Sequence, residues 1–424
     1  MTLTSVSGSI KEINDDQTAD IISDKLHLSA VHDISGIELS SDVTIEQATT
    51  DGNIDIQSLG NLTIEHATTD GNIDIQASGN ITIKESQTKT GAITIQAADT
   101  ITALHIDSKG SLTIQNTEGD IIIDHILSND KISLNSNQGS ILEYDDDLEA
   151  DIITTHVLLQ AEKDIQQLEL IDNTTVDAFS NSGTIAIQGL RSLILNDIYA
   201  SGIDIKTASD ILARNLVSTG DSIKLYVAEG DITIGEIQSA DDLIIITNRG
   251  SILDDSDDNH VDITAMDYIT LLASYDIGND TNIEVAAGSK IVSSSTEKGS
   301  INIHGKGDLI LETLDTSDGN INIYADGTIK AINIVTGNKD ADQDVSCSII
   351  SKESVETGII KSDDTLIIQA DSIAQAFGNS QANVAMLTAL NGIGSDNKSL
   401  ELNVNKLGLN TTNNGTFIHN NKDL

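Results

Sequence analysis

The feature that most restricts the fold of this chain is an internal repeat of 19 residues. Residues 45–63 read IEQATTDGNIDIQSLGNLT and residues 64–82 read IEHATTDGNIDIQASGNIT, so these two segments differ at only four positions. A degenerate form of the unit continues along the chain with a step of 19 or 20 residues. A fixed period of this length is typical of solenoids, in which each repeat is one structural unit stacked on the previous one.

Each unit contains two short segments of alternating hydrophobicity, and each segment follows a small or acidic turn residue. Segments such as Ile54-Asp55-Ile56 and Ile93-Thr94-Ile95 place isoleucine on one face of a strand and a polar residue on the other. The turn residues form two series: Gly52, Gly71, Gly91, Gly110 and Asp130, and then Gly60, Gly79, Asp99, Gly119 and Gly139. Two strands and two turns make one coil of about 19–20 residues, and we predict that such coils stack about 4.8 Å apart as a parallel β-solenoid.

The chain contains no proline in 424 residues. Proline cannot donate a hydrogen bond to a strand ladder, and in a solenoid nearly every strand is a central strand. The missing proline therefore agrees with a solenoid along the whole chain. At about 20 residues per coil, we expect roughly 20 coils and a rod of about 100 Å.

A longer period lies over the short one. The tripeptide Gly-Ser-Ile begins at residues 8, 139 and 250, and an Asp-Ile pair begins twelve residues later at 20, 151 and 262. We interpret the chain as a single solenoid, 1–424, with sub-modules at 1–138, 139–249, 250–346 and 347–424. Residues 372–390 are the most helix-like stretch of the chain, but residues 384–390 also fit a strand, so both remain open.

The composition argues against several classes of function. Lysine and arginine number 22 against 67 aspartates and glutamates, which leaves a net charge of −45. Such a chain would be repelled by the phosphates of nucleic acids and by anionic lipid surfaces. No apolar run approaches the length of about 20 residues that a membrane helix needs, so we predict neither nucleic-acid binding nor membrane insertion. Hydrophobic residues make up 38% of the chain, enough to form a core.

The sequence pattern of the repeats resembles that of a known family. Runs such as GNLTIE, GDITIG and GSILDD, followed by LLASYDIG, are similar to the repeat regions of filamentous-haemagglutinin-like exoproteins, which are large secreted bacterial adhesins. The resemblance implies a right-handed parallel β-helix that is exported, often by two-partner secretion through an outer-membrane transporter. It also implies an extracellular or cell-surface location and a role in attachment, aggregation or biofilm formation.

The sequence departs from this family in one respect. Two-partner exoproteins carry a secretion domain with an Asn-Pro signature, and a chain without proline has no such signature. No signal peptide is visible at the N-terminus. We interpret the chain as an internal or truncated piece of a larger adhesin that binds a host-cell or extracellular glycan or protein receptor. Open solenoid ends are also expected to favour end-to-end self-association.

Acidic turns are the candidate metal ligands. Asp145, Asp146 and Asp147 follow the second Gly-Ser-Ile tripeptide, and Asp254, Asp255, Asp257 and Asp258 follow the third. Clustered carboxylates suit Ca²⁺, which takes six to eight oxygen ligands. The alternative is a solvated acidic loop, because neither cluster has EF-hand spacing. We predict no other cofactor.

The sequence predicts a non-catalytic, structural and adhesive protein. The alternative is a polysaccharide lyase or glycoside hydrolase on a β-helix scaffold. Asp124-His125 and His304-Gly305 faintly resemble segments of such enzymes, but their expected companion residues are missing. The single cysteine, Cys347, alternates with Val345 and Ile349 and is predicted to point into the core.

Overall fold

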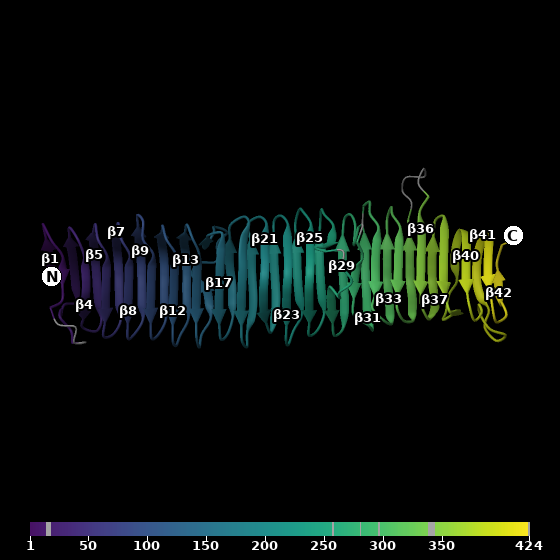
Figure 1. Ribbon diagram of the computed structural model, residues 1–424, viewed down its shortest axis with the longest axis horizontal. Helices are drawn as coiled ribbons and strands as arrows, with labels where there is room; N and C mark the ends of the chain where they lie inside the picture. The colour runs from purple at the N-terminus through teal and green to yellow at the C-terminus, as the bar shows by residue number, and fades with distance from the viewer. Residues whose placement is uncertain (14–17, 257, 280, 296, 338–343, 423–424) are drawn as a thin grey trace. The chain divides into compact units, whose positions relative to one another are not determined.

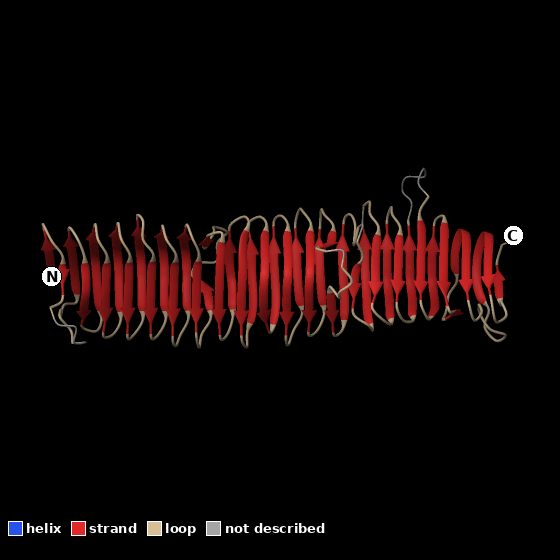
Figure 2. Cartoon of the chain, in the orientation of Figure 1, coloured by secondary structure: helices blue, strands red, loops and turns tan. Residues whose placement is uncertain are grey.

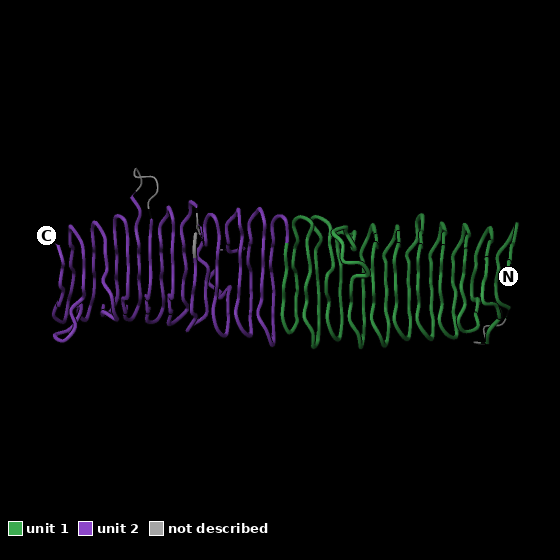
Figure 3. The backbone as a smooth tube through the Cα atoms, turned by 180° about the vertical axis from the view of Figure 1, so that it is seen from behind, with its two compact units in different colours: residues 1–206 green, residues 207–424 purple. Residues whose placement is uncertain are grey.

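The computed structural model describes residues 1–13, 18–256, 258–279, 281–295, 297–337 and 344–422, and it contains two compact units, Met1–Lys206 and Thr207–Leu424 (Figure 3). Among the described residues there are strands and turns but no helix (Figure 2). Almost all paired strands run parallel, and a strand typically pairs with the strand two places further along the chain (Figure 1). The predicted all-β fold, a parallel β-helix, is confirmed.

The first unit contains strands that alternate between the two sides of each coil. They are β1 (Thr2–Ser5), β2 (Ile10–Lys11), β3 (Lys25–Ala30), β4 (Ile34–Leu39), β5 (Val43–Thr50), β6 (Ile54–Ser58), β7 (Leu62–Thr69), β8 (Ile73–Ala77), β9 (Ile81–Thr88), β10 (Ile93–Ala97), β11 (Ile101–Ser108), β12 (Leu112–Asn116), β13 (Ile121–Ser128), β14 (Ile132–Ser136), β15 (Ile141–Glu143), β16 (Ile152–Ile153), β17 (His156–Ala161), β18 (Ile165–Leu170), β19 (Thr174–Ser180), β20 (Thr184–Gly189), β21 (Leu193–Ala200) and β22 (Gly202–Thr207).

The second unit follows the same plan. Its strands are β23 (Ile211–Ser218), β24 (Ile223–Val227), β25 (Ile232–Ser239), β26 (Leu243–Thr247), β27 (Ile252–Asp254), β28 (Ile263–Ala265), β29 (Tyr268–Ala273), β30 (Ile283–Val285), β31 (Ser289–Ser295), β32 (Ile301–Gly305), β33 (Leu309–Thr316), β34 (Ile321–Ala325), β35 (Ile329–Thr336), β36 (Ser346–Ser351), β37 (Ser354–Ser362), β38 (Thr365–Ala370), β39 (Ser372–Gln375), β40 (Ser380–Ala389), β41 (Leu400–Thr411) and β42 (Ile418–Asn420). Residues 372–390, which the sequence left open between helix and strand, thus contain β39 and all of β40.

The core is a set of aligned columns of branched apolar side chains. In one column, parallel register places Ile54, Ile73, Ile93, Leu112 and Ile132 directly above one another. Each of these side chains is at most 1% exposed. Because the side chains alternate, the residues between them face outward, and the same outward positions also align from coil to coil.

Polar ladders connect the turns of neighbouring coils. The side-chain oxygen of Asn53 accepts a hydrogen bond from the backbone N–H of Asn72 at 2.9 Å, and the oxygen of Asn72 accepts one from Ala92 at 2.9 Å. A Cβ atom on Gly91 would collide with the backbone of Gly71, which shows how closely successive turns stack. These contacts explain the Gly-Asn and Gly-Asp pairs that open so many strands.

Cys347 is fully buried, and Val345 and Ile349 point into the core beside it, as the alternation predicted. Burial raises the pKa of its thiol to about 12.

In the described part of the chain, we find no helix with the length and apolar character to cross a bilayer.

Candidate binding sites

Of the aspartates predicted to hold calcium, Asp145, Asp146 and Asp147 follow β15, Asp254 ends β27, and Asp255 and Asp258 follow β27. Five of them are exposed, Asp254 is half-buried, and Asp257 lies outside the described residues: the exposed set is Asp145, Asp146, Asp147, Asp255 and Asp258. Asp258 pairs with His260 at 3.1 Å, and its hydrogen bonds to His260 hold its pKa below the usual range. Among those aspartates that the structure describes, only Asp254 lies in a close group of three acids.

The structure instead brings carboxylates together at the ends of these loops. β13 pairs with both β15 and β16, so the loop between them interrupts what is elsewhere one continuous strand. Glu143 ends β15, Asp151 immediately precedes β16, and Glu169 lies on β18 in the next coil. One carboxylate oxygen from each of these three residues lies within 4.8 Å of the other two. We call this group the Glu143 triad.

The Glu143 triad is held in place by the backbone. Asp151 and Glu169 are 3% and 6% exposed. The backbone N–H of Glu169 donates to Oδ2 of Asp151 at 2.8 Å, and this hydrogen bond connects the end of the loop to the next coil. The buried Oε2 atom of Glu169 has no hydrogen-bond partner among the described residues.

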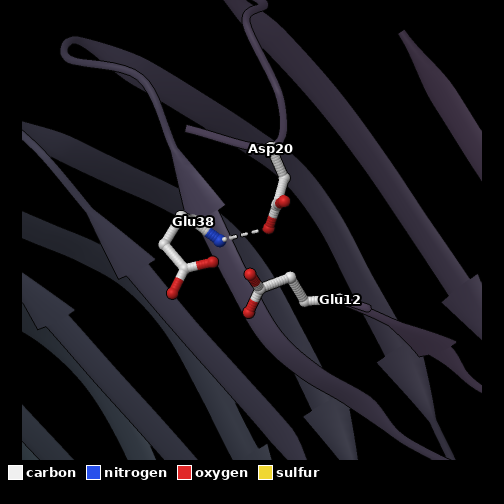
Figure 4. A group of neighbouring side chains, drawn as sticks. All are labelled: Glu12, Asp20 and Glu38. Atoms are coloured by element: carbon white, nitrogen blue, oxygen red, sulfur yellow. Dashed lines mark hydrogen bonds between the residues drawn. The ribbon is translucent and has the colours of Figure 1, made fainter. Parts of the chain in front are cut away.

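A second triad occupies the equivalent place after the first Gly-Ser-Ile tripeptide. Glu12 follows β2, Asp20 precedes Ile21, and Glu38 lies on β4, with their carboxylates gathered as Figure 4 shows. The N–H of Glu38 donates to Oδ2 of Asp20 at 3.1 Å. Glu38 is 2% exposed, and its Oε2 atom is buried without a hydrogen-bond partner in the described region. We call this group the Glu12 triad.

The third copy, the Asp254 triad, differs in its charge. Asp254, Asp262 and Glu284 are arranged in the same way, and the N–H of Glu284 donates to Asp262 at 2.7 Å. Here, however, Lys306 lies 3.4 Å and His304 lies 3.5 Å from Oε1 of Glu284. A lysine ammonium therefore supplies part of the positive charge that three carboxylates require.

Burial controls the ionisation of these acids. Burial, together with the neighbouring carboxylates of Glu169, Asp146 and Asp147, raises the pKa of Glu143 to about 7. It also raises the pKa of Asp151 and of Glu169, and Asp146 and Asp147 on the loop add to this effect at Glu169. Three mutually close carboxylates are thus costly to ionise unless a cation lies among them.

A fourth group of three acids, Asp241, Asp242 and Asp267, is of a different kind. Asp241 is exposed, and Asp267 pairs with Lys290 at 2.7 Å. Because this group is accessible to solvent and already paired, it resembles an ordinary acidic surface.

Sequence reasoning located the loops but missed the triads. Two of the three acids of each triad have a sequence signal: one lies two residues after the Ile of Gly-Ser-Ile, and one is the Asp of the Asp-Ile pair. Glu38 and Glu169 each stand between two apolar residues on a strand. Alternation alone would place such a residue in solvent, whereas here Glu38 and Glu169 are 2% and 6% exposed.

A separate hollow of about 340 Å³ lies on the outside of the first unit. Register places Asn135, Gln160, Phe179 and Tyr199 in one outward column over four successive coils. Phe179 and Tyr199 are 37% and 41% exposed. Glu162 lines the same hollow from a neighbouring turn. We call this surface the aromatic hollow; its sequence signal is the spacing of 20 residues between its two rings, which is one coil.

The two histidines considered for catalysis, His125 and His304, each contact neighbouring side chains or backbone groups. The His125 ring stacks on His105 with centroids 5.1 Å apart, and its Nδ1 atom lies 3.1 Å from the carbonyl oxygen of Ala150. Burial raises the pKa of Asp124. His304 lies beside the Asp254 triad, between Glu284 and Asp326.

No family model, curated protein or solved structure matches this chain.

Proposed function

We propose that the chain is a non-catalytic, adhesive solenoid, part of a filamentous adhesin at a bacterial surface or in its surroundings. The observation that carries this proposal is the aromatic hollow. Only nine residues of the chain are tyrosine or phenylalanine, yet two of them share one outward column beside amide and carboxylate side chains.

The chemistry of the hollow suits a glycan. Aromatic faces pack against the apolar faces of sugar rings, while amides donate hydrogen bonds to hydroxyl groups and both amides and carboxylates accept hydrogen bonds from them. Neighbouring coils are about 4.8 Å apart, close to the width of a sugar ring. Phe179 and Tyr199 therefore form a platform on which one or two rings can stack, with Gln160 and Glu162 beside it.

A glycan panel tests the proposal. The full chain is applied to immobilised extracellular and cell-surface polysaccharides, and both retention and released sugar are measured. We expect retention without release. Phe179→Ala and Tyr199→Ala should each reduce retention at least tenfold, whereas Phe377→Ala, which removes an exposed ring from the second unit, should leave it unchanged. Equal retention of all four proteins would refute a role for the hollow.

Location and export are part of the same proposal. Antibodies against the chain should label intact cells of the source organism, and the reading frame should lie beside a gene for an outer-membrane transporter. Labelling only after lysis would contradict the adhesin. Dynamic light scattering over a range of concentrations tests the proposed end-to-end association, for which particle size should increase with concentration.

The rival function is a polysaccharide lyase or glycoside hydrolase, and one observation favours it. Glu143 has a raised pKa, about 7, as a general acid at neutral pH requires. Against it, the triad oxygens lie within 4.8 Å of one another, and the arrangement occurs three times instead of once. Inverting glycosidases separate their carboxyl groups by about 6.5–9.5 Å and retaining ones by about 5–5.5 Å, so the spacing argues against inverting hydrolysis alone and the threefold occurrence is the stronger objection. Release of sugar that Glu143→Gln abolishes would establish the rival.

A further inference from the structure

The three acidic triads share one architecture but differ in their source of positive charge. In each triad, two acids come from one coil, and the third comes from the next coil. A backbone N–H of the third acid donates to the second in every copy. This repetition at equivalent places indicates that the carboxylates have a common purpose.

We propose that the Glu143 triad and the Glu12 triad each bind one Ca²⁺ ion, which joins two successive coils. The oxygens of each triad lie close enough together to share one ion. Calcium takes oxygen ligands in flexible geometry, and water completes its coordination where protein ligands are few.

Two buried oxygen atoms support this assignment independently of the acidic composition. Oε2 of Glu169 and Oε2 of Glu38 lie in side chains that are at least nine-tenths buried, and neither has a hydrogen-bond partner among the described residues. A buried polar atom without a partner is unfavourable, and a bound cation removes that penalty. The surroundings add negative charge, because Asp146 and Asp147 lie close enough to the Glu143 triad to act on Glu169.

The Asp254 triad provides an internal contrast. Lys306 lies 3.4 Å from Glu284 and donates to Asn259 on the loop at 2.5 Å, so a lysine connects the loop to the neighbouring coil. We infer that Lys306 takes the place of the ion in this copy. Two strong calcium sites per chain are therefore expected, although three triads are present.

Isothermal titration of the full chain with Ca²⁺ at pH 7.5, after treatment with a chelator, measures the number of sites. The wild-type chain should bind two equivalents. Glu169→Gln and Glu38→Gln should each bind one, because an amide replaces one charged ligand and keeps the shape of the side chain. Glu284→Gln should still bind two, and so should Asp145→Asn, which removes an exposed acid from the same loop as the Glu143 triad.

A thermal melt separates specific binding from general screening of charge. Millimolar Ca²⁺ should raise the melting temperature of the wild-type chain more than NaCl of equal ionic strength does. Circular dichroism verifies that the variants are folded. No saturable binding to the wild-type chain, or the same stoichiometry in Glu169→Gln and Glu38→Gln as in the wild type, would overturn the proposal. Loss of a site in Asp145→Asn, but not in Glu169→Gln, would place calcium on the exposed loop instead.

Discussion

Truncation of one buried side chain in an apolar column of the core should destabilise the surrounding coils strongly and locally. Ile114 on β12 is fully buried between Ile95 on β10 and Leu134 on β14. Ile114→Ala removes three carbon atoms. At about 0.8 kcal/mol for each buried methylene, the transfer contribution is about 2.4 kcal/mol. The cavity that remains adds to this cost, within the range of about 2–5 kcal/mol seen for such truncations.

Hydrogen exchange measured by mass spectrometry is the appropriate assay, because coils of a solenoid open locally and a single unfolding free energy is not defined for the whole chain. A loss of about 2.4 kcal/mol accelerates local opening about 60-fold, at 1.4 kcal/mol for each factor of ten. We expect this acceleration in peptides covering β10, β12 and β14, and a much smaller one in distant coils of the first unit.

Thr113→Ala is the matched control for this experiment. Thr113 neighbours Ile114 on the same strand but faces outward, so its truncation should cost about 0.5 kcal/mol or less. Similar acceleration in both variants would refute the argument that the aligned core columns, and not the strand hydrogen bonds alone, stabilise the coils.

Three further results are expected. Gly91→Ala should lower the melting temperature by several degrees, because its Cβ would collide with the backbone of the previous turn, whereas Gly408→Ala, where the nearest atom is 3.8 Å away, should not change it. Cys347 should resist alkylation by iodoacetamide in the folded chain at pH 8 and react after denaturation, because burial raises its pKa to about 12; rapid labelling of the native chain would contradict its place in the core. Without calcium, the pKa of Glu143 is about 7 in the folded chain and ordinary in the unfolded chain, so the folded state holds a proton that unfolding releases. The melting temperature of the chelated protein should therefore fall between about pH 4.5 and pH 7, and it should fall less in Glu143→Gln, as differential scanning calorimetry would measure.

Sequence reasoning was most reliable where contacts repeat at a constant interval. The near-identical segments 45–63 and 64–82 already imply that residues 19 apart are stacked neighbours, and the register of β5 with β7 and of β6 with β8 confirms it. The inward position of Cys347 followed from alternation alone. Where the pattern was irregular, as in residues 372–390, the local sequence could not choose between helix and strand, and pairing with neighbouring coils decided for strands.

The two candidate sites show the limit of such reasoning. Glu143 and Glu169 are 26 residues apart, a separation that includes a loop as well as a coil, so no constant period connects them. Few residues are aromatic, and the composition does not show which of them meet; the stacking of coils brings Phe179 and Tyr199 into one column.

The sequence alone determined the repeat, the length of the coil, the alternation that fills the core and the exclusion of proline, because each of these depends on contacts with the same short spacing. Only the tertiary structure decided which acids meet. The exposed aspartates Asp145, Asp146 and Asp147 are the most conspicuous in the sequence, but the loop turns them toward solvent. The buried triad forms from residues that the next coil brings beneath the loop, and that proximity depends on where a strand is interrupted in three dimensions.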